Sequence, residues 1–303
     1  MKILVTGAKG QLGNKIEQVL GKIHDLVLTD YDNMDITDIE AVRQVVSTEK
    51  PHYIIHAAAY TKVDKAEEEI ELCRKINSLG TKNIATVAKE FGAHLIYIST
   101  DFVFDGLNST KNGPRNKPYK ETDIAKPISI YGLTKYEGEE FIRKICDKHY
   151  IIRVAWLFGE LPKDQTGLNK GTNFVEIMLR LAKERSQEKD IEKAVLKVVD
   201  DQIGSPTYTG DLVNVLAKII SETPEYGTYH FSGTDESSWH DFAKEIFKQT
   251  GTKANLKPVS SKEYPQKAKR PSYSHLDKTK IESALKIKVR SWKKMLEEYI
   301  KGR

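Results

Sequence analysis

The sequence predicts an α/β protein built on a doubly wound parallel sheet, with a smaller α/β lobe near the C-terminus. Short apolar, β-rich runs alternate with helix-length segments through the first half of the chain, as in parallel sheets covered by helices. A glycine-rich turn lies directly between the first such run and the first helix-length segment. At 303 residues the chain is long enough for one large domain or two unequal ones.

Each predicted strand in the first half of the chain is followed by a predicted helix. Residues 67–91 are long enough for one extended helix or for two abutting helices. A further helix should carry Lys135, between the fourth and fifth strands. The predicted strands lie at 2–6, 25–29, 53–58, 94–99 and 150–156, and the other early helices lie at 11–20 and 39–48.

The character of the sequence changes after Phe158, where a polar, glycine-containing stretch begins. The highly charged segment 184–193 should be an exposed loop or a helix end. We expect two parts of the chain: residues 1–158 with about 208–230, and about 159–207 with 231–303. The later helices are predicted at 174–184, 211–221 and 239–250, and the later strands at 197–199 and 228–232.

Composition excludes several classes of protein. The apolar fraction is 39%, and no segment approaches the roughly 18 apolar residues that a membrane span requires. The N-terminus has the pattern of a strand rather than of a signal peptide. Two distant cysteines, Cys73 and Cys146, fit buried thiols in a reducing cytoplasm. The net charge of +5 lies mostly on mixed surfaces, so we expect an anionic small substrate rather than nucleic acid.

The glycine-rich turn contains Gly7, Gly10 and Gly13. Glycines at such a turn let the backbone approach a pyrophosphate, which the amides of the following helix can bind. Three glycines in seven residues also form ordinary tight turns, and the spacing differs from the Gly-x-Gly-x-x-Gly fingerprint. The position between a strand and a helix nevertheless favours a Rossmann-like dinucleotide site.

The type of dinucleotide is open. Asp30 closes the second predicted strand, where a carboxylate can accept a hydrogen bond from the adenosine ribose of NADH. Lys9, within the turn, could instead pair with the 2′-phosphate of NADPH. Asp30 is also a common type of residue in a turn after a strand. The sequence therefore predicts NADPH or NADH without choosing between them.

Tyr131 and Lys135 are four residues apart on the same predicted helix, which places a phenol beside an ammonium. A phenol has a pKa of about 10, and a nearby ammonium lowers this value by stabilising the phenolate. Thr100 ends the fourth predicted strand, in the crevice where open α/β sheets bind ligands. We therefore expect Tyr131 to donate a proton during reduction of a carbonyl, with Lys135 as its activator and Thr100 polarising the carbonyl.

These motifs resemble the extended short-chain dehydrogenase/reductases and, among them, the dTDP-4-dehydrorhamnose reductase family. The resemblance covers nearly the whole chain, and the late string DDQIGSPT looks the most specific. The strings that carry it are GxxGQLG at 7–13, AAAYTKVDKAE at 57–67, STDFVFDG at 99–106, YGLTKYEGE at 131–139, NFVEIMLRLA at 173–182 and VVDDQIGSPTYTGDL at 198–212.

The resemblance implies that the first part of the chain binds the dinucleotide and the second part the nucleotide sugar. Asn77 would support the helix of Tyr131, and Ile152, Arg153 and Val154 would lead toward the nicotinamide. The implied catalytic residues are Thr100, Tyr131 and Lys135; the implied cofactor contacts are Gly7, Gly10, Gln11, Leu12, Gly13, Asp30, Asp35, Ile36, Ala57, Ala58, Tyr60, Tyr131 and Lys135; and the implied substrate contacts are Asp101, Phe102, Trp156, Gln202, Ser205, Pro206 and Thr207.

Two positions depart from the family pattern. Phe102 follows the Thr-Asp pair where the family usually has Tyr, so a hydroxyl that would face the substrate is absent, and the ring could simply pack there. Related 4,6-dehydratases carry Glu at this site, so dehydration is not expected. His56 stands where Asn is common before the AAAY string, and we expect it to be structural.

The implied reaction is reduction of the C4 ketone of dTDP-4-dehydro-L-rhamnose by NAD(P)H in the cytoplasm, for polysaccharide biosynthesis. Two alternatives stay open: a reductase of another dTDP-keto-deoxysugar, and a non-catalytic NADP-binding module like the regulatory subunit of methionine adenosyltransferase. Some family members form homodimers with Mg²⁺ held by C-terminal glutamates. Here Glu297 and Glu298 read as a helix face, so the sequence predicts no metal, and a homodimer is only one option.

Overall fold

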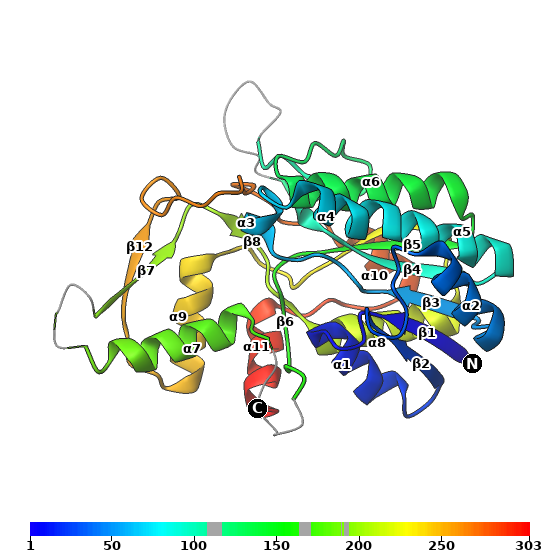
Figure 1. Cartoon of the computed structure of the whole chain (residues 1–303). Coiled ribbons are helices and arrows are strands. Elements are labelled where there is room, and N and C mark those ends of the chain that lie inside the picture. The colour runs from blue at the N-terminus through cyan, green and yellow to red at the C-terminus, as the bar shows by residue number, and fades with distance from the viewer. Residues whose placement is uncertain (108–116, 164–170, 189, 191–193) are drawn as a thin grey trace.

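The computed structural model of the chain describes residues 1–107, 117–163, 171–188, 190 and 194–303. Its centre is a six-stranded sheet in the order β10-β5-β4-β3-β1-β2, with every neighbouring pair parallel (Figure 1). The doubly wound parallel sheet predicted from the sequence is confirmed. The strands are β1 (Lys2–Thr6), β2 (Asp25–Thr29), β3 (Tyr53–His56), β4 (His94–Thr100), β5 (His149–Val154) and β10 (Gly227–Phe231).

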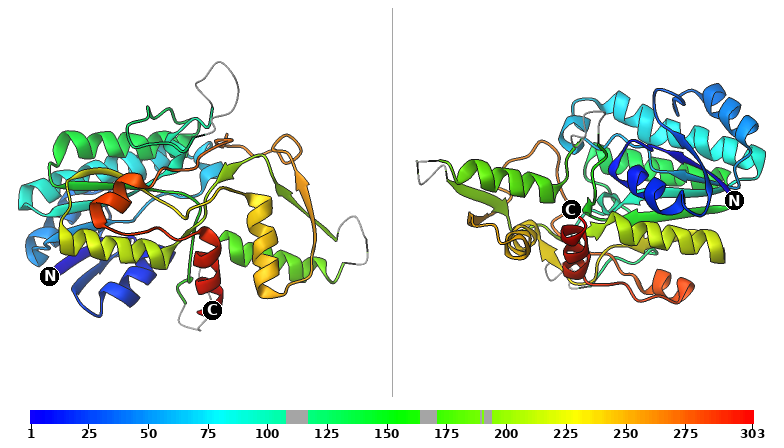
Figure 2. Two further views of the ribbon diagram at one scale, coloured as in Figure 1. Left: turned by 180° about the vertical axis from the view of Figure 1, so that it is seen from behind. Right: turned by 90° about the horizontal axis from the view of Figure 1, so that it is seen from below.

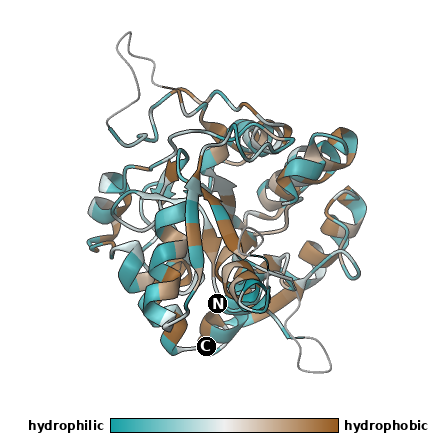
Figure 3. Cartoon of the chain, turned by 90° about the vertical axis from the view of Figure 1, so that its left-hand side faces the viewer, coloured by the Kyte–Doolittle hydropathy of each residue, from teal (hydrophilic) through white to brown (hydrophobic). Residues whose placement is uncertain are grey.

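Helices cover both faces of the sheet because successive strand residues point to opposite sides. On β1, Ile3 and Val5 join the apolar cluster that includes α1 and α8, whereas Leu4 joins the cluster beneath α2, α5 and α6. Figure 3 shows apolar residues on the strands and on the helix faces turned toward them. The helices are α1 (Gln11–Leu20), α2 (Ile39–Glu49), α5 (Thr81–Phe91), α6 (Ile130–Ile145) and α8 (Thr209–Glu222).

The strand order reverses between β1 and β3. From β1 the chain crosses to β2 on one side, whereas β3 pairs with the other side of β1 and leads on to β4. At such a reversal the connections leave the sheet in opposite directions and open a crevice at the carboxyl ends of the strands. This reversal positions the site described below.

A second group of elements lies to one side of the sheet, as two further views show (Figure 2). Two parallel strands, β7 (Val195–Val199) and β12 (Asn255–Val259), contact α9 (Trp239–Thr250). Helix α7 (Phe174–Arg185) packs against α9, as does α11 (Trp292–Lys301). The short strands are β6 (Leu157–Phe158), β8 (Ile203–Gly204), β9 (Thr207–Tyr208) and β11 (Ser237–Ser238).

Helix α10 (Thr279–Leu285) comes between β12 and α11 in the sequence, both of which belong to the second group. It packs on β10 and α8, so a segment close to the C-terminus helps to cover the central sheet. Its Ile281 and Leu285 are fully buried in the cluster shared with α8. The exact division of the chain into two parts stays a prediction.

The helical region predicted at 67–91 is continuous from Ile70 but not uniform. It runs through α4 (Ile70–Arg74) and a π-helical segment (Lys75–Gly80) into α5, preceded by the short helix α3 (Val63–Ala66). The extended alternative is therefore confirmed, with a later start. Apolar periodicity cannot reveal a π-turn, because it changes the hydrogen-bond partners without breaking the helix.

The sequence analysis did not predict several elements of the structure: β12, α10, α11 and the two-residue strands. The strands and α10 are short, so local pattern carries little signal for them. Helix α11 does show a helical apolar period at Trp292, Met295, Leu296 and Tyr299 after the capping residue Ser291, a signal that could have revealed it. Both cysteines are buried, as expected. Within the part of the chain that the structure describes, no helix has the length and apolar character needed to cross a membrane.

Candidate active site

The glycine turn forms a close-fitting cradle between β1 and α1. Gly7 has φ +69°, and a Cβ there would lie 2.7 Å from the backbone nitrogen of Ala58. A Cβ on Gly13 would lie 2.5 Å from Ala8 Cα, and Gly10 caps the N-terminus of α1. Gln11 Oε1 is buried without a hydrogen-bond partner among the described residues. Exposed amides at a helix N-terminus and a backbone free of Cβ atoms fit a dinucleotide pyrophosphate.

The acidic end of the cleft follows β2. The Asp30 carboxylate accepts the backbone N–H of Lys9 at 3.0 Å and that of Tyr31 at 2.9 Å. The Lys9 ammonium lies 2.5 Å from Asp32 instead of meeting Asp30. Asp30 thus ties the glycine turn to the end of β2, and both Asp30 and Lys9 line the cleft.

The three predicted catalytic residues meet where β4 ends and α6 begins. Thr100 is the last residue of β4, and its hydroxyl donates to Asp101 Oδ1 at 3.1 Å. Tyr131 and Lys135 lie in the first two turns of α6. A Cβ on Gly132 would lie 2.2 Å from the Phe102 carbonyl oxygen, so a glycine here lets α6 start against the end of β4.

Burial controls the protonation of Tyr131 and Lys135. Burial raises the pKa of the Tyr131 phenol well above its usual value, although the Thr100 hydroxyl partly offsets this. Burial lowers the pKa of the Lys135 ammonium to about 7, against the effect of Glu139. Lys135 Nζ donates to the Ile98 carbonyl at 2.7 Å and lies 4.0 Å from the centre of the Tyr97 ring.

This geometry corrects one expectation. The sequence predicted that Lys135 lowers the pKa of Tyr131, but the ammonium is directed at Ile98 and the pKa of the phenol is raised. The reason is that both groups lose hydration within the protein, and each then favours its neutral form. Tyr131 consequently keeps its proton at neutral pH.

Asp101 and Phe102 continue the site beyond Thr100. Asp101 is 2% exposed, and burial raises the pKa of its carboxyl to about 6, with the Ser274 and Thr100 hydroxyls acting against this. Phe102 meets the Tyr131 ring edge-on, with centroids 5.7 Å apart and an interplanar angle of 78°. The Phe102 ring therefore packs against the phenol at the position where the family usually has Tyr.

An aromatic wall closes the far side. Trp156 has φ +47°, and its indole stacks on Trp239 with centroids 3.7 Å apart. The ring centroids of Phe174 and Trp239 are 4.6 Å apart. A Cβ on Gly204 would lie 2.7 Å from the Trp156 ring, so the glycine makes room for the indole. Flat aromatic surfaces of this kind suit stacking against a base or a sugar.

One cleft of about 1260 Å³ connects these features. It runs from the glycine turn past β4 to the aromatic wall, and it is large enough for two extended ligands. The predicted residues that line it are Gly7, Gly10, Gln11, Leu12, Gly13, Asp30, Asp35, Ile36, Ala57, Ala58, Thr100, Asp101, Phe102, Tyr131, Lys135 and Trp156.

Five predicted site residues do not line this cleft: Tyr60, Gln202, Ser205, Pro206 and Thr207. Ser205 donates to the Gly233 carbonyl at 2.6 Å, and Thr207 donates to the Ala155 carbonyl at 2.5 Å. Gln202 Nε2 donates to Ser261 Oγ at 2.9 Å. The Thr207 backbone N–H also donates to the Trp156 carbonyl at 3.1 Å. In this structure Thr207 therefore supports the turn that presents Trp156, whereas Ser205 and Gln202 join other segments of the chain.

Asn77 and His56 have structural roles. Asn77 Oδ1 accepts the Tyr60 N–H at 2.8 Å, and its Nδ2 donates to Thr134 on α6 at 3.3 Å. His56 is fully buried between the hydroxyls of Thr6 and Thr81, at 2.7 and 3.0 Å, and burial lowers its pKa to about 3. Asn77 thus braces the helix that carries Tyr131, and His56 stays neutral.

The sequence analysis missed Arg270, Asp64 and Trp239 as residues of the cleft. Arg270 donates to both oxygens of Asp64, at 3.1 and 2.7 Å, and both residues line the cleft. No local pattern could have revealed a pair so far apart in sequence. Trp239 offered a weak signal, because tryptophan is rare in this chain and this one begins a predicted helix.

Metal-binding potential is limited in the regions that the structure describes. Asp200, His240 and Asp241 lie close enough together to share an ion, and Asp200 already accepts the Ser238 hydroxyl at 2.5 Å. Glu297 and Glu298 form ion pairs with Lys301 and Arg290 on the surface of α11.

Comparison with known proteins agrees with this geometry. The family model described as the RmlD substrate binding domain matches residues 1–303. A dTDP-4-dehydrorhamnose reductase of Aggregatibacter actinomycetemcomitans is 40% identical over 97% of both chains. The spore coat polysaccharide biosynthesis protein SpsK of Bacillus subtilis is 38% identical, over 100% of this chain and 98% of its own.

A solved structure is also similar. The dTDP-4-dehydrorhamnose reductase of Bacillus anthracis, crystallised with NADP, superposes with a TM-score of 0.89 at 40% identity, over 100% of this chain and 99% of its own. The match to the family model and these identities over full chain lengths lead to one conclusion: the chain belongs to the RmlD substrate-binding-domain family.

Proposed function

We propose that this protein is an NAD(P)H-dependent oxidoreductase that reduces the C4 ketone of dTDP-4-dehydro-L-rhamnose to dTDP-L-rhamnose. The observation that carries the proposal is the convergence of Thr100, Tyr131 and Lys135 in one cleft with the glycine cradle. Relatives that cover the full chain are named for this reaction, and one was crystallised with NADP. NADPH is therefore the first cofactor to test, and NADH the second.

Each residue of the cleft has a distinct role in such a reduction. The dinucleotide, when bound on Gly7, Gly10 and Gly13, supplies a hydride. Tyr131 donates its proton to the carbonyl oxygen as negative charge develops there, which its raised pKa permits because an alkoxide is more basic than a phenolate. Thr100 polarises the same oxygen, and the Lys135 ammonium offsets the charge left on the phenolate.

A diphosphate needs positive charge in the part of the cleft that would hold the sugar. Among the described residues that line the cleft after residue 158, Arg270 is the only cation. It is held by Asp64, a carboxylate that also accepts the Ala268 N–H at 3.1 Å. The Arg270 guanidinium and the Ala268 N–H thus already donate to a carboxylate, that of Asp64. We infer that these two donors form part of the diphosphate site.

The proposal is tested with the purified full-length chain. Oxidation of NADPH or NADH should require dTDP-4-dehydro-L-rhamnose and should be lost in Tyr131→Phe. If this substrate is inert while another dTDP-keto-deoxysugar is reduced, the protein is a related deoxysugar reductase. If nucleotide binds but no tested sugar turns over in the wild type or in Tyr131→Phe, a non-catalytic binding module is favoured.

Two finer expectations accompany this proposal: the reaction takes place in the cytoplasm, and the product serves polysaccharide biosynthesis. A homodimer stays a prediction, and sedimentation of the purified protein would test it directly.

A further inference from the structure

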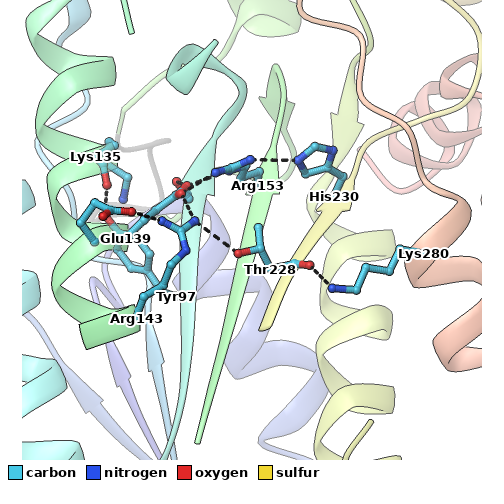
Figure 4. A network of polar contacts seen from close by, with 10 residues as sticks. Tyr97, Lys135, Glu139, Arg143, Arg153, Thr228, His230 and Lys280 are labelled. Carbon is cyan, nitrogen blue, oxygen red and sulfur yellow. Dashed lines mark hydrogen bonds and ion pairs between the residues drawn. The ribbon is translucent and has the colours of Figure 1, made fainter. Parts of the chain in front are cut away.

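A buried ionic cluster lies directly beneath the end of β4, and the mechanism above does not use it. Ser99, Arg153 and His230 are cross-strand partners on β4, β5 and β10, so they form a polar row across one face of the sheet. Arg153 Nη1 lies 3.4 Å from His230 Nε2. Glu139 reaches into this row from α6 (Figure 4).

Glu139 is fully buried and uses both carboxylate oxygens. Oε1 accepts the Ser99 hydroxyl at 2.5 Å and Arg153 Nε at 2.9 Å. Oε2 accepts Arg153 Nη2 and Arg143 Nη2, both at 2.7 Å. Burial opposes the charge on Glu139, but the two guanidinium groups hold the pKa of its carboxyl well below its usual range. Glu139 is therefore an anion at every pH where the protein would work.

The position of Glu139 links it to two residues of the proposed mechanism, Lys135 and Thr100. It lies one helical turn after Lys135, a spacing that puts Cβ atoms about 5–6 Å apart. It also holds Ser99, the residue that directly precedes Thr100 on β4. The buried charge of Glu139 is thus linked to the Lys135 ammonium on one side and, on the other, to the strand that carries the Thr100 hydroxyl.

The other groups around Lys135 do not supply a comparable negative charge. From β4 it faces the Tyr97 ring and the Ile98 carbonyl, and burial raises the pKa of the Tyr97 phenol. From β3 it faces His56, which is neutral. From α4 it faces Cys73, whose thiol pKa is raised by burial. On α6 itself, Tyr131 stays protonated, which leaves Glu139 to favour the ammonium.

We propose that Glu139 is a positioning residue of the reduction, which keeps Lys135 as an ammonium and holds the strand end that carries Thr100. This inference rests on the proposed function. Stability alone does not account for the cluster, because a buried ion pair is often no more stabilising than apolar residues of the same volume.

The first test is the pH dependence of kcat in Glu139→Gln. Losing the carboxylate should lower the pH at which Lys135 loses its proton by about one unit or more. A shift from 7 to 6 would reduce the ammonium fraction, and with it kcat, about fivefold at pH 7 and hardly at pH 5. A purely structural lesion would instead lower kcat by a similar factor at both pH values.

Glu140→Gln is the matched control. Glu140 lies next to Glu139 on α6 and loses the same charge, but its partner is Arg143 at 2.6 Å and its side chain is 38% exposed. This variant should keep the wild-type pH profile. Equal shifts in the two variants, or no shift in an active Glu139→Gln, would overturn the proposal.

A second measurement does not depend on turnover. The ε-carbon resonance of Lys135, in protein labelled with [ε-¹³C]lysine and assigned with Lys135→Arg, reports the ammonium titration directly. Its midpoint should fall in Glu139→Gln and stay in place in Glu140→Gln. If the wild type reduces no dTDP-keto-sugar, the proposed function fails, whereas an unchanged Lys135 titration in Glu139→Gln would defeat this inference.

Glu139→Gln leaves the Arg153 guanidinium buried without its carboxylate and could prevent folding. In that case Glu139→Gln/Arg153→Gln is compared with Arg153→Gln alone. The Lys135 midpoint should be lower in the double variant, because the two proteins differ only in the carboxylate. Equal midpoints would contradict the proposal.

Discussion

At the scale of single residues, burial decides the chemistry of the site. Tyr131 and Lys135 are both pushed toward their neutral forms, and the geometry directs Lys135 toward Ile98 rather than toward the phenol. The proton donor is thus a weak acid that releases its proton only to a strong base. This favours proton transfer to a developing alkoxide over loss of the proton to water.

Tyr131→Phe should reduce kcat by about 10²–10⁴-fold, because the proton donor is lost while the ring still packs against Phe102. Dissociation constants for NADPH and NADH, measured by fluorescence titration, should stay within about threefold of wild type. Retention of more than a tenth of wild-type kcat would show that another group donates the proton.

Asp101→Asn should stabilise the protein at neutral pH. The folded pKa of about 6 lies above the usual aspartate value of 3.8, so the folded state binds more protons between these values and stability falls as pH rises through them. Removing the charge should raise the free energy of unfolding at pH 7 by about 1–3 kcal/mol. Urea unfolding should show a much smaller gain near pH 4.

The same substitution should lower activity, because Asp101 lines the cleft beside Thr100. A gain in stability coupled to a loss of turnover would identify Asp101 as a strained functional residue. If Asp101→Asn destabilises equally at both pH values, lost hydrogen bonding outweighs the relieved charge.

At the scale of elements, the glycine turn offers a controlled comparison. Gly7 and Gly92 have nearly the same positive φ, +69° and +70°, but of these two only Gly7 would bring a Cβ within 4 Å of other atoms. Gly92→Ala should cost about 1 kcal/mol of unfolding free energy from backbone strain alone. Gly7→Ala should cost clearly more, because its Cβ would lie 2.7 Å from Ala58 N.

Gly7→Ala should also weaken NADPH binding at least tenfold, since moving the turn displaces the amides that would hold the pyrophosphate. Isothermal titration with both variants would separate this effect from strain. Unchanged binding in Gly7→Ala would argue against the cradle as the pyrophosphate site.

Elements with strong local patterns were predictable from the sequence. Helices α1 and α9 begin and end where the pattern predicts, because apolar spacing, glycines and capping residues such as Ser238 act within a few residues. Of the parallel pair β7 and β12, only β7 was predicted from the sequence. Strand β12 has exposed lysine and a proline, and only its docking against β7 makes it a strand.

At the scale of the whole molecule, cofactor binding should stabilise the fold. A ligand that binds only the native state at 100 times its Kd adds about 2.7 kcal/mol. NADPH at that excess should therefore raise Tm by several degrees. Thermal shifts with NADPH and NADH, repeated in Asp30→Ala, would show which cofactor the protein prefers.

Asp30 joins the second strand to the glycine turn, so Asp30→Ala should weaken both cofactors and NADH more strongly. A carboxylate at this position can accept a ribose hydroxyl but repels a 2′-phosphate. An equal loss for both cofactors would mean that Asp30 acts only by holding the turn.

The sequence by itself determined the alternation of strands and helices in the first half of the chain, the glycine cradle, and the positions of Thr100, Tyr131 and Lys135. These features depend on local periodicity and on short-range chemistry. Tertiary structure alone decided which side chains face the cleft. It paired Arg270 with Asp64 across 206 residues, stacked Trp156 on Trp239, and turned the hydroxyls of Ser205 and Thr207 away from the cleft toward backbone carbonyls. Such contacts depend on how distant segments pack together, which no local pattern of residues specifies.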